Sequence, residues 1–564
     1  MPGDRRAGVL AQRAADLAAA AGVTLPDDLR LWHLAQALPR ASRRLADFDP
    51  GPKTAMSTTG EQLGAALEEL LSTGERRAGA HYTPPEVSRR VAAMALGGPG
   101  AGARRVVDMS CGGGALLLAA GDALVAAGAD PADVARELLW GADIDPLAVA
   151  VTEAAIALWS GGTRPAEGHL VVADTLSSGR DAWALAPPAG FDALVGNPPF
   201  QGQLDSITAR SRSVATALKA RFGGAATGYV DTAALFLLAA TEVVRPGGGL
   251  AMVVPQSVIG ARDAARARAA VDERATLRDM WAPDRHVFAA KVHVCVLALQ
   301  MRDEPATGSA RLDGGDGSWT KELARSKGAP VVELTGGQHI ADLATAAAGF
   351  RDEYYGLVGH VREAAEGAVP APLVTSGSIG VATCTWGQRP IRFAKRSWAR
   401  PEVDLPALAA ANQRTSAWVE RLRRPKVVVA TQTRVLEAAA DHSGSWVAAT
   451  PVVSVLPHDP ADVARLTAVL CAPPVSAWAL GRAAGTAMAP DAIRVSTALV
   501  LAVPLPLDAA AWDAASEALA AGDLCAYAEL ATAMYLLPPE EADAVVPWWH
   551  ARRPRSGGNG VANA

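Results

Sequence analysis

The sequence predicts an α/β fold, a mainly parallel sheet with helices on both faces, followed by a separate α+β domain. Between residues 104 and 300, short runs rich in Val, Ile and Leu alternate with helical stretches. Several of these runs end in an acidic residue, and the texture turns to Gly, Asp, Ser and Pro between residues 302 and 330. Apolar runs that are separated by helices are typical of strands buried on both faces of a parallel sheet.

The length and composition indicate a globular protein with more than one core. The chain has 564 residues, of which 50% are hydrophobic and 20% charged, so two or three cores are expected. No apolar run is long and free enough of charge to cross a bilayer, and the N-terminus has no apolar stretch of signal-peptide type. We therefore expect a cytoplasmic protein that does not engage a membrane.

The five cysteines are scattered, and none forms a CxxC pair or neighbours a histidine at zinc-ligand spacing. No metal site is expected. The formal net charge of −5 does not indicate whether the chain binds nucleic acid, because binding needs a local basic surface rather than a basic chain.

Changes in composition along the chain predict five segments. Strand-like runs are expected in the C-terminal half at residues 426–430, 452–455 and 499–503, with a helix at residues 463–470. The segments are an N-terminal helical part (1–75), a catalytic α/β domain (76–305), a linker or loop (306–330), a recognition-like α+β domain (331–551) and a disordered tail (552–564).

The first predicted strand of the α/β domain runs into a glycine-rich turn. It ends in Asp108, and Ser110, Gly112 and Gly114 follow before a helical stretch. Glycine lets the backbone turn tightly and approach a ligand, and the N–H groups at a helix start can face a carboxylate. These residues are candidates for a cofactor loop.

The next two predicted strands also end in acidic residues. Asp143 closes the second, where an acid can hold the ribose hydroxyls of a nucleotide-type cofactor, with Ile144 beside it. Asp145 is expected to cap the following helix. Asp174 closes the third strand and could accept the exocyclic amino group of an adenine. Three acidic strand ends on one sheet edge predict a cofactor site.

The fourth predicted strand runs into the tetrapeptide Asn197, Pro198, Pro199 and Phe200. The prolines fix φ and stiffen a row of carbonyl acceptors, the Asn197 amide oxygen adds another acceptor, and Phe200 adds a flat stacking face. When two acceptors bind the hydrogens of an amino group, a pyramidal geometry of its nitrogen is favoured. The lone pair of that nitrogen can then attack an electrophilic methyl group. This chemistry needs positioning and electrostatics, and it needs no strong base.

With these motifs the chain resembles the N6-adenine DNA methyltransferases of restriction–modification systems, in particular TaqI-like and type I or type IIG enzymes. The resemblance implies a Rossmann-like sheet that binds S-adenosylmethionine and a C-terminal target-recognition domain, in the gamma order. It implies cofactor contacts from Tyr82 and Thr83, which lie in a Tyr-Thr-Pro segment, and from Asn197. It also implies stacking of a flipped base on Phe200 and Phe288, with base flipping costing about a few kcal/mol.

Two positions depart from the family pattern. Met109 stands where the cofactor loop often has proline, and the strand-end acid and glycines are kept. Phe200 replaces the commoner tyrosine, which keeps the stacking face and loses a hydroxyl.

The resemblance implies double-stranded DNA as partner, and a restriction nuclease or defence subunits on separate chains. Two basic stretches of the C-terminal half are expected to contact DNA phosphates. Their predicted DNA-binding residues are Arg389, Arg392, Lys395, Arg396, Arg423, Arg424 and Lys426.

Three other functions stay open on the sequence alone. The same tetrapeptide serves methyltransferases of RNA bases or of protein glutamine. A DNA-specificity component with a silent catalytic core is a second alternative. A fused nuclease is a third, although no paired acids with a lysine stand out.

Overall fold

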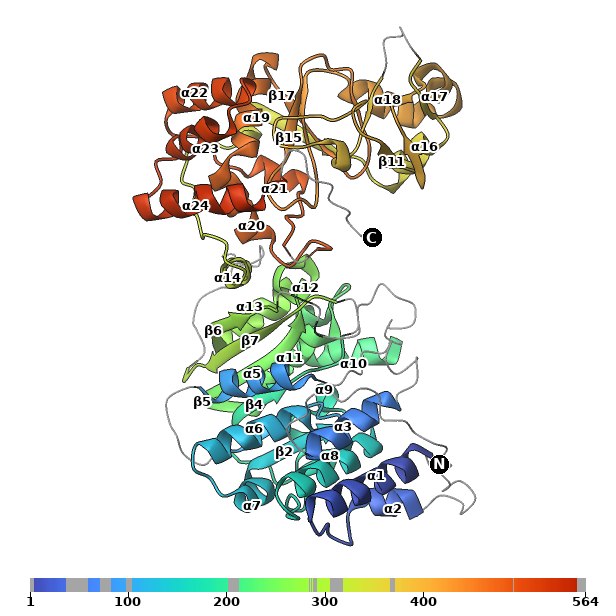
Figure 1. Ribbon diagram of the computed structural model, residues 1–564, viewed down its shortest axis with the longest axis vertical. Coiled ribbons are helices and arrows are strands. Elements are labelled where there is room, and N and C mark those ends of the chain that lie inside the picture. The colour runs from blue at the N-terminus through green and yellow to red at the C-terminus, as the bar shows by residue number, and fades with distance from the viewer. Residues whose placement is uncertain are drawn as a thin grey trace. The chain divides into compact units, whose positions relative to one another are not determined.

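The computed structural model describes residues 5–36, 59–70, 83–97, 104–200, 212–283, 285, 287, 292–304, 318–365, 371–489 and 491–554. The chain divides into two compact units, Met1–Trp319 and Thr320–Ala564 (Figure 1). Separate clusters of buried apolar side chains lie inside each unit.

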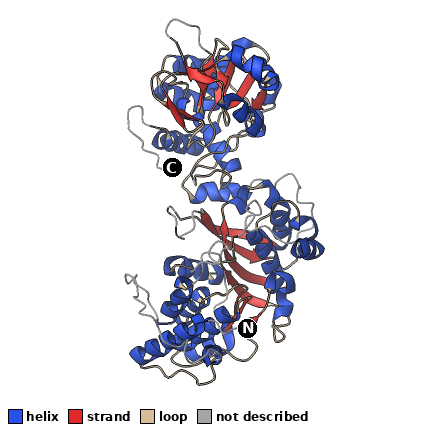
Figure 2. Cartoon of the chain, turned by 90° about the vertical axis from the view of Figure 1, so that its right-hand side faces the viewer, coloured by secondary structure: helices blue, strands red, loops and turns tan. Residues whose placement is uncertain are grey.

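The first unit is built on a seven-stranded sheet in the order β3-β2-β1-β4-β5-β7-β6. The five strands from β3 to β5 run parallel, whereas β7 pairs antiparallel with both β5 and β6. The predicted fold class, a mainly parallel sheet with helices on both faces, is confirmed (Figure 2). The strands are β1 (Val106–Asp108), β2 (Leu139–Asp143), β3 (Leu170–Val172), β4 (Phe191–Gly196), β5 (Val244–Pro255), β6 (Ala275–Trp281) and β7 (Val294–Met301).

Helices cover the two faces of this sheet in separate groups. α5 and α6 pack on each other and on the central strands, and α8 packs on β2 and β3. α11 and α13 pack on each other, with α11 against β5 and α13 against β6. The larger helices are α5 (Pro85–Leu96), α6 (Ala115–Ala126), α8 (Pro146–Trp159), α10 (Arg212–Phe222), α11 (Thr232–Val243) and α13 (Ala265–Arg274), and shorter ones are α7 (Pro131–Asp133), α9 (Thr175–Ser178) and α12 (Ser257–Gly260).

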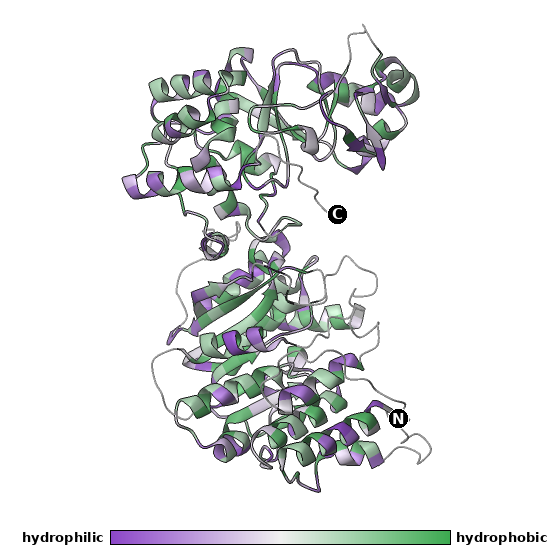
Figure 3. Cartoon of the chain, in the orientation of Figure 1, coloured by the Kyte–Doolittle hydropathy of each residue, from purple (hydrophilic) through white to green (hydrophobic). Residues whose placement is uncertain are grey.

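Helix α8 is buried on almost every side, which explains its nearly uniform apolar sequence. One side faces the sheet, and the N-terminal helices α1 (Arg5–Ala21), α2 (Arg30–Gln36) and α3 (Thr59–Glu69) cover another. Asp145 caps α8 by accepting a hydrogen bond from the Leu147 amide at 2.9 Å, as the sequence predicts. The central strands and α8 appear green in the hydropathy view (Figure 3).

The second unit is an α+β domain around a four-stranded antiparallel sheet in the order β15-β14-β17-β8. Three two-stranded pairs accompany it: β10 with β16, β11 with β12, and β13 with β9. The strands are β8 (Ala344–Ala348), β9 (Val361–Glu363), β10 (Leu373–Val374), β11 (Ile391–Phe393), β12 (Arg396–Trp398), β13 (Pro401–Val403), β14 (Lys426–Val429), β15 (Ala438–Asp441), β16 (Val447–Ala448) and β17 (Val453–Pro457).

Helices of the second unit fall into two groups. One group packs among α16, α17 and α18, and the other among α19, α20, α22, α23 and α24, whereas α21 packs on β8 and α15. The helices are α15 (Ile340–Leu343), α16 (Arg351–Val358), α17 (Leu405–Ala411), α18 (Gln413–Leu422), α19 (Val463–Cys471), α20 (Pro473–Ala483), α21 (Thr497–Leu501), α22 (Ala509–Ala520), α23 (Leu524–Ala533) and α24 (Pro539–Arg552).

Two expectations about secondary structure need correction. The run at residues 499–503 was expected as a strand, but Thr497–Leu501 forms α21 because the Ser496 hydroxyl accepts a hydrogen bond from the Leu499 amide and caps it. Part of the predicted linker is helical as well, since α14 occupies Ser318–Ser326. Short apolar runs do not by themselves distinguish strand from helix.

No single helix among the described residues is long and apolar enough to cross a membrane. The stretches Pro460–Cys471 and Pro473–Ala483 reach that length and composition only as a pair, which is bent by 63°.

Candidate functional site

The turn after β1 is the first part of the site. The Asp108 side chain is buried, and its Oδ1 accepts a hydrogen bond from the Ser110 amide at 2.9 Å. Gly112 and Gly114 have φ of 52° and 86°, a left-handed conformation that favours glycine. Burial raises the pKa of Asp108 to about 7; the Ser110 hydrogen bond opposes this rise and the nearby Asp143 carboxylate adds to it.

Asp143 at the end of β2 lies next to this turn. Its carboxylate accepts hydrogen bonds at 3.0 Å from the backbone amides of Gly112 and Asp145, so it ties the turn to the second strand. Burial raises the pKa of Asp143 as well. Among the described residues neither Asp108 nor Asp143 forms an ion pair. The following residue, Ile144, leaves 73% of its surface exposed.

Asp174 lies at the third strand end, and it caps the short helix α9. Its Oδ1 accepts hydrogen bonds from the amides of Leu176 and Ser177, and its Oδ2 accepts one from the Ser177 hydroxyl at 2.6 Å. Its role as acceptor for an adenine amino group therefore stays a prediction.

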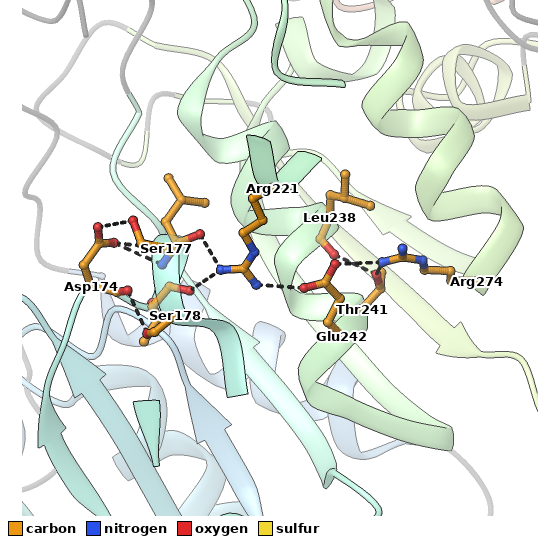
Figure 4. A network of polar contacts seen from close by, with 10 residues as sticks. Asp174, Ser177, Ser178, Arg221, Leu238, Thr241, Glu242 and Arg274 are labelled. Carbon is orange, nitrogen blue, oxygen red and sulfur yellow. Dashed lines mark hydrogen bonds and ion pairs between the residues drawn. The ribbon is translucent and has the colours of Figure 1, made fainter. Parts of the chain in front are cut away.

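Arg221 of α10 holds the other end of α9 (Figure 4). Its Nη1 donates to the carbonyl of Leu176 at 2.6 Å, and its Nη2 contacts Glu242 Oε2 at 2.7 Å. Glu242 is also paired with Arg274 at 3.1 Å, so one chain of polar contacts joins α9, α10, α11 and α13. A polar pocket of about 480 Å³ lies here, lined by Ser177, Ser178, Arg180, Asp181, Arg221 and Glu242.

Two buried threonines connect these pieces, and the sequence offered no signal for either. The Thr175 hydroxyl donates to the Met109 carbonyl at 2.7 Å, which joins α9 to the turn after β1. The Thr152 hydroxyl donates to the Gly112 carbonyl at 2.7 Å from α8. The glycine turn after β1 and the acidic residues that follow the strands are thus held in one hydrogen-bonded layer at the carboxyl edge of the sheet.

Asn197 directly follows β4 at the same edge. Its Nδ2 donates to the Thr83 hydroxyl oxygen at 2.9 Å, while its Oδ1 is buried and has no hydrogen-bond partner among the described residues. A buried acceptor left open is costly and is found where a ligand completes it. The bond orients the amide, so Thr83, predicted to contact the cofactor, is placed against the tetrapeptide. Tyr82 lies outside the described residues.

The rest of the tetrapeptide lies close to the core. Pro198 is buried and Pro199 half-buried. Phe200 is also half-buried and packs on the main apolar cluster of the first unit. The predicted partner in base stacking, Phe288, lies outside the described residues. Within the described ranges no group of three or more His, Cys, Asp or Glu side chains could hold a metal ion.

The predicted DNA-binding residues divide into two groups. Arg389, Arg392, Lys395 and Arg396 are exposed on and beside the β11–β12 hairpin, and Arg424 is exposed before β14. Arg423 is partly buried and pairs with Glu420 at 3.1 Å.

Lys426 does not fit the prediction that it contacts DNA. Its side chain is fully buried at the start of β14, and its Nζ lies 2.6 Å from Asp441 Oδ2. The local run of basic residues could not show this, because burial of Lys426 depends on pairing between β14 and β15.

Comparisons with known proteins agree with this geometry. Residues 58–311 match the family model described as N-6 DNA Methylase. No curated protein matches the sequence. The Type IIL restriction-modification enzyme MmeI, solved in complex with DNA, is 13% identical, with 98% of this chain and 89% of that chain covered and a TM-score of 0.52.

Two further solved structures are similar at lower scores. The type IIG restriction endonuclease BpuSI is 12% identical, with 98% of this chain and 77% of that chain covered and a TM-score of 0.39. The type I restriction-modification methyltransferase subunit from Streptococcus thermophilus is 20% identical, with 44% and 51% covered and a TM-score of 0.32.

The similarity to MmeI is one of fold, and it extends over both units. The family match covers the sheet, the glycine turn, the acidic strand ends and the tetrapeptide. Residues 58–311 are therefore similar to the N-6 DNA methylase family.

Proposed function

We propose that this chain is a site-specific DNA methyltransferase that transfers a methyl group from S-adenosylmethionine to N6 of a flipped-out adenine. We further propose that it is the modification component of a restriction–modification or phage-defence system. The observation that carries the proposal is the Oδ1 of Asn197 at the carboxyl end of β4, which is buried and has no hydrogen-bond partner among the described residues. An oriented amide oxygen at that point suits an amino group as ligand.

The residues at the sheet edge fit S-adenosylmethionine. The buried Asp108 and the half-buried Asp143 lie together without a cation among the described residues. A ligand that carries hydroxyl donors and positive charge would complete them. The exposed Ile144 offers an apolar surface for a base ring, and Asp174 an acceptor for its amino group. The backbone of Ser110, Gly112 and Gly114 would line the bound ligand. When bound, the cofactor supplies an electrophilic methyl group.

The chain's own contribution to transfer is the positioning of the amino nitrogen. Asn197 Oδ1 accepts one amino hydrogen and the carbonyl platform of Pro198 accepts the other, which directs the nitrogen lone pair away from the ring. Thr83 keeps the Asn197 amide from rotating, because Nδ2 is bound to its hydroxyl at 2.9 Å. Phe200 holds the flat face of the base. Orientation of this kind lowers the barrier without a strong base.

A labelled-methyl assay tests the proposed function directly. The full chain is incubated with S-adenosylmethionine labelled in its methyl group and with unmethylated DNA, RNA or protein extract, and the products are digested and separated. We expect label in N6-methyladenine from DNA. Label in RNA alone, or in glutamine of protein alone, would replace this proposal with one of the two alternative substrates.

Cofactor binding decides whether the chain is a specificity component with a catalytically silent core. Calorimetric titration of the protein with S-adenosylmethionine should show binding. If no cofactor binds and no substrate is labelled, a catalytically silent specificity component becomes the better interpretation. Expression in a methylation-free host with long-read mapping of modified bases then gives the target sequence.

A further inference from the structure

The β11–β12 hairpin has an unusual turn. β11 and β12 pair antiparallel, with Arg392 opposite Ser397 and Phe393 opposite Arg396. The two turn residues, Ala394 and Lys395, have φ of 51° and 63°. A two-residue turn with both φ positive normally takes Asn-Gly or Gly-Gly, because other side chains are strained there. Strain of this kind is kept where a particular side chain is needed, and here it places a lysine at the tip.

The hairpin is firmly anchored on one face. Ile391 and Phe393 are buried, and Trp398 donates from its indole nitrogen to the Phe393 carbonyl at 3.1 Å. The ring of Phe393 lies 5.1 Å from that of Tyr354 in α16, and Figure 1 shows β11 beside α16. The opposite face carries Arg392 and Ser397, both exposed. The backbone that presents these two side chains is therefore rigid.

The positive charges of the hairpin are uncompensated. Arg389, Arg392, Lys395 and Arg396 are exposed, and among the described residues none of the four forms an ion pair. Arg362 on nearby β9, by contrast, contacts both Glu402 and Asp404. Four unpaired cations within eight residues repel one another, and a polyanion relieves that repulsion.

We propose that the β11–β12 hairpin enters the major groove of duplex DNA and reads base edges with Arg392 and Ser397. Arg389, Lys395 and Arg396 hold the flanking phosphates. A two-stranded ribbon fits the major groove of B-form DNA, where arginine pairs with guanine and serine with several bases. The major groove of an RNA duplex is too deep and narrow for such contacts, which favours DNA. The inference deepens the proposed function, since it names how that enzyme chooses its target.

The test is selection of duplexes from a random DNA library by the full chain, followed by binding measurements between 50 and 200 mM salt. Wild type should select a defined sequence. Arg392→Ala should lose preference at one base pair, with discrimination there falling about 10- to 100-fold. Arg389→Ala and Arg396→Ala should weaken binding to all sequences alike and reduce the slope of log K against log salt by about 1 each.

Arg434→Ala is the matched control, because Arg434 is exposed and paired with Asp491 at 2.8 Å in the same unit. It should change neither sequence preference nor salt slope. Unchanged preference in Arg392→Ala, equal effects in the control, or tighter binding of RNA or single strands by wild type would overturn the hairpin proposal.

Binding selection needs no methyl transfer, so the two proposals fail separately. A protein that selects a DNA sequence through Arg392 and labels no DNA contradicts the proposed reaction alone. A protein that methylates DNA with the same sequence preference after Arg392→Ala contradicts the hairpin proposal alone.

Discussion

Buried charges are treated differently in the two units. In the second unit, Lys426 and Asp441 are both fully buried and lie 2.6 Å apart, and Asp441 also accepts hydrogen bonds from the Trp446 amide and the Ser443 hydroxyl. In the first unit, Asp108 and Asp143 are neighbouring acids held by backbone amides, and neither has a cation among the described residues. The Lys426–Asp441 pair is closed, because each charge has its partner, and it supports the fold. Asp108 and Asp143 have no described cation as partner, which leaves room for a ligand.

The largest effect is expected from breaking the closed pair. Lys426→Met should lower the free energy of unfolding by about 3–5 kcal/mol, because it leaves the Asp441 carboxylate buried without its cation. Urea unfolding followed by tryptophan fluorescence measures the change. The double variant Lys426→Met with Asp441→Leu should recover much of the loss. A single variant as stable as wild type would show that the pair does not support the fold.

Asn197→Ala should act on chemistry alone. We expect kcat to fall on the order of 100- to 1000-fold, comparable with loss of one preorganised polar group in other active sites, with cofactor affinity and unfolding free energy close to wild type. Turnover and calorimetric cofactor binding are measured together.

Asn412→Ala is the matched control for Asn197→Ala, since the Asn412 side chain caps α18 in the second unit. Thr83→Val should give a smaller loss of kcat, because the Asn197 amide is then free to turn. Turnover of Asn197→Ala equal to that of the control would remove Asn197 from the mechanism.

Asp108→Asn should change how stability depends on pH. The folded-state pKa of Asp108 is about 7, above its value of about 3.9 in an unfolded chain. The native state therefore holds this proton more tightly, and its stabilising effect is present below about pH 4 and lost as pH rises to 7.

Relative to the Asn variant, wild type should lose on the order of 3 kcal/mol over this range. Asparagine keeps the oxygen that accepts from Ser110. Urea unfolding of both proteins from pH 4 to pH 8 measures the difference, and parallel pH profiles would contradict the buried-acid explanation.

Arg221→Gln should give the smallest effect. Loss of the donor to the Leu176 carbonyl loosens α9, whose first turn is capped by Asp174, so we expect the Kd for cofactor to rise about fivefold, or about 1 kcal/mol, with little change in kcat. Arg221→Lys should recover part of this.

Arg245→Gln is its control, because Arg245 pairs with Asp192 at 2.7 Å at the start of β4. If both glutamine variants weaken cofactor binding equally, α9 has no special part in it.

The sequence predicted the local features of the first unit well. Strand ends at Asp108 and Asp143 could be read directly, since each follows a short apolar run. Asp174 was predicted to end the third strand, but β3 ends at Val172 and Asp174 caps α9. The same reasoning placed the cap at Asp145. Such features depend on residues that are neighbours in the chain.

Contacts between distant segments could not be read in this way. The bond between Thr83 and Asn197, and that between Thr175 and Met109, depend on how strands and helices assemble. Burial of Lys426 has the same origin, because only the pairing of β14 with β15 brings Asp441 to it. The prediction of a strand at residues 499–503 was wrong for a local reason, because the helix cap at Ser496 outweighed the strand-like composition.

One of the N-terminal helices, α3, touches the glycine turn that follows β1. A Cβ added to Gly113 would lie 2.7 Å from the Cα of Gly64 in α3, so the two backbones leave no space for a side chain between them. A side chain at position 113 would therefore collide with the backbone of α3, and no substitution at Gly64 could relieve that collision. In evolutionary terms, we expect position 113 to stay glycine, and the helices before residue 70 to be inherited with the sheet of the first unit rather than exchanged as a separate module.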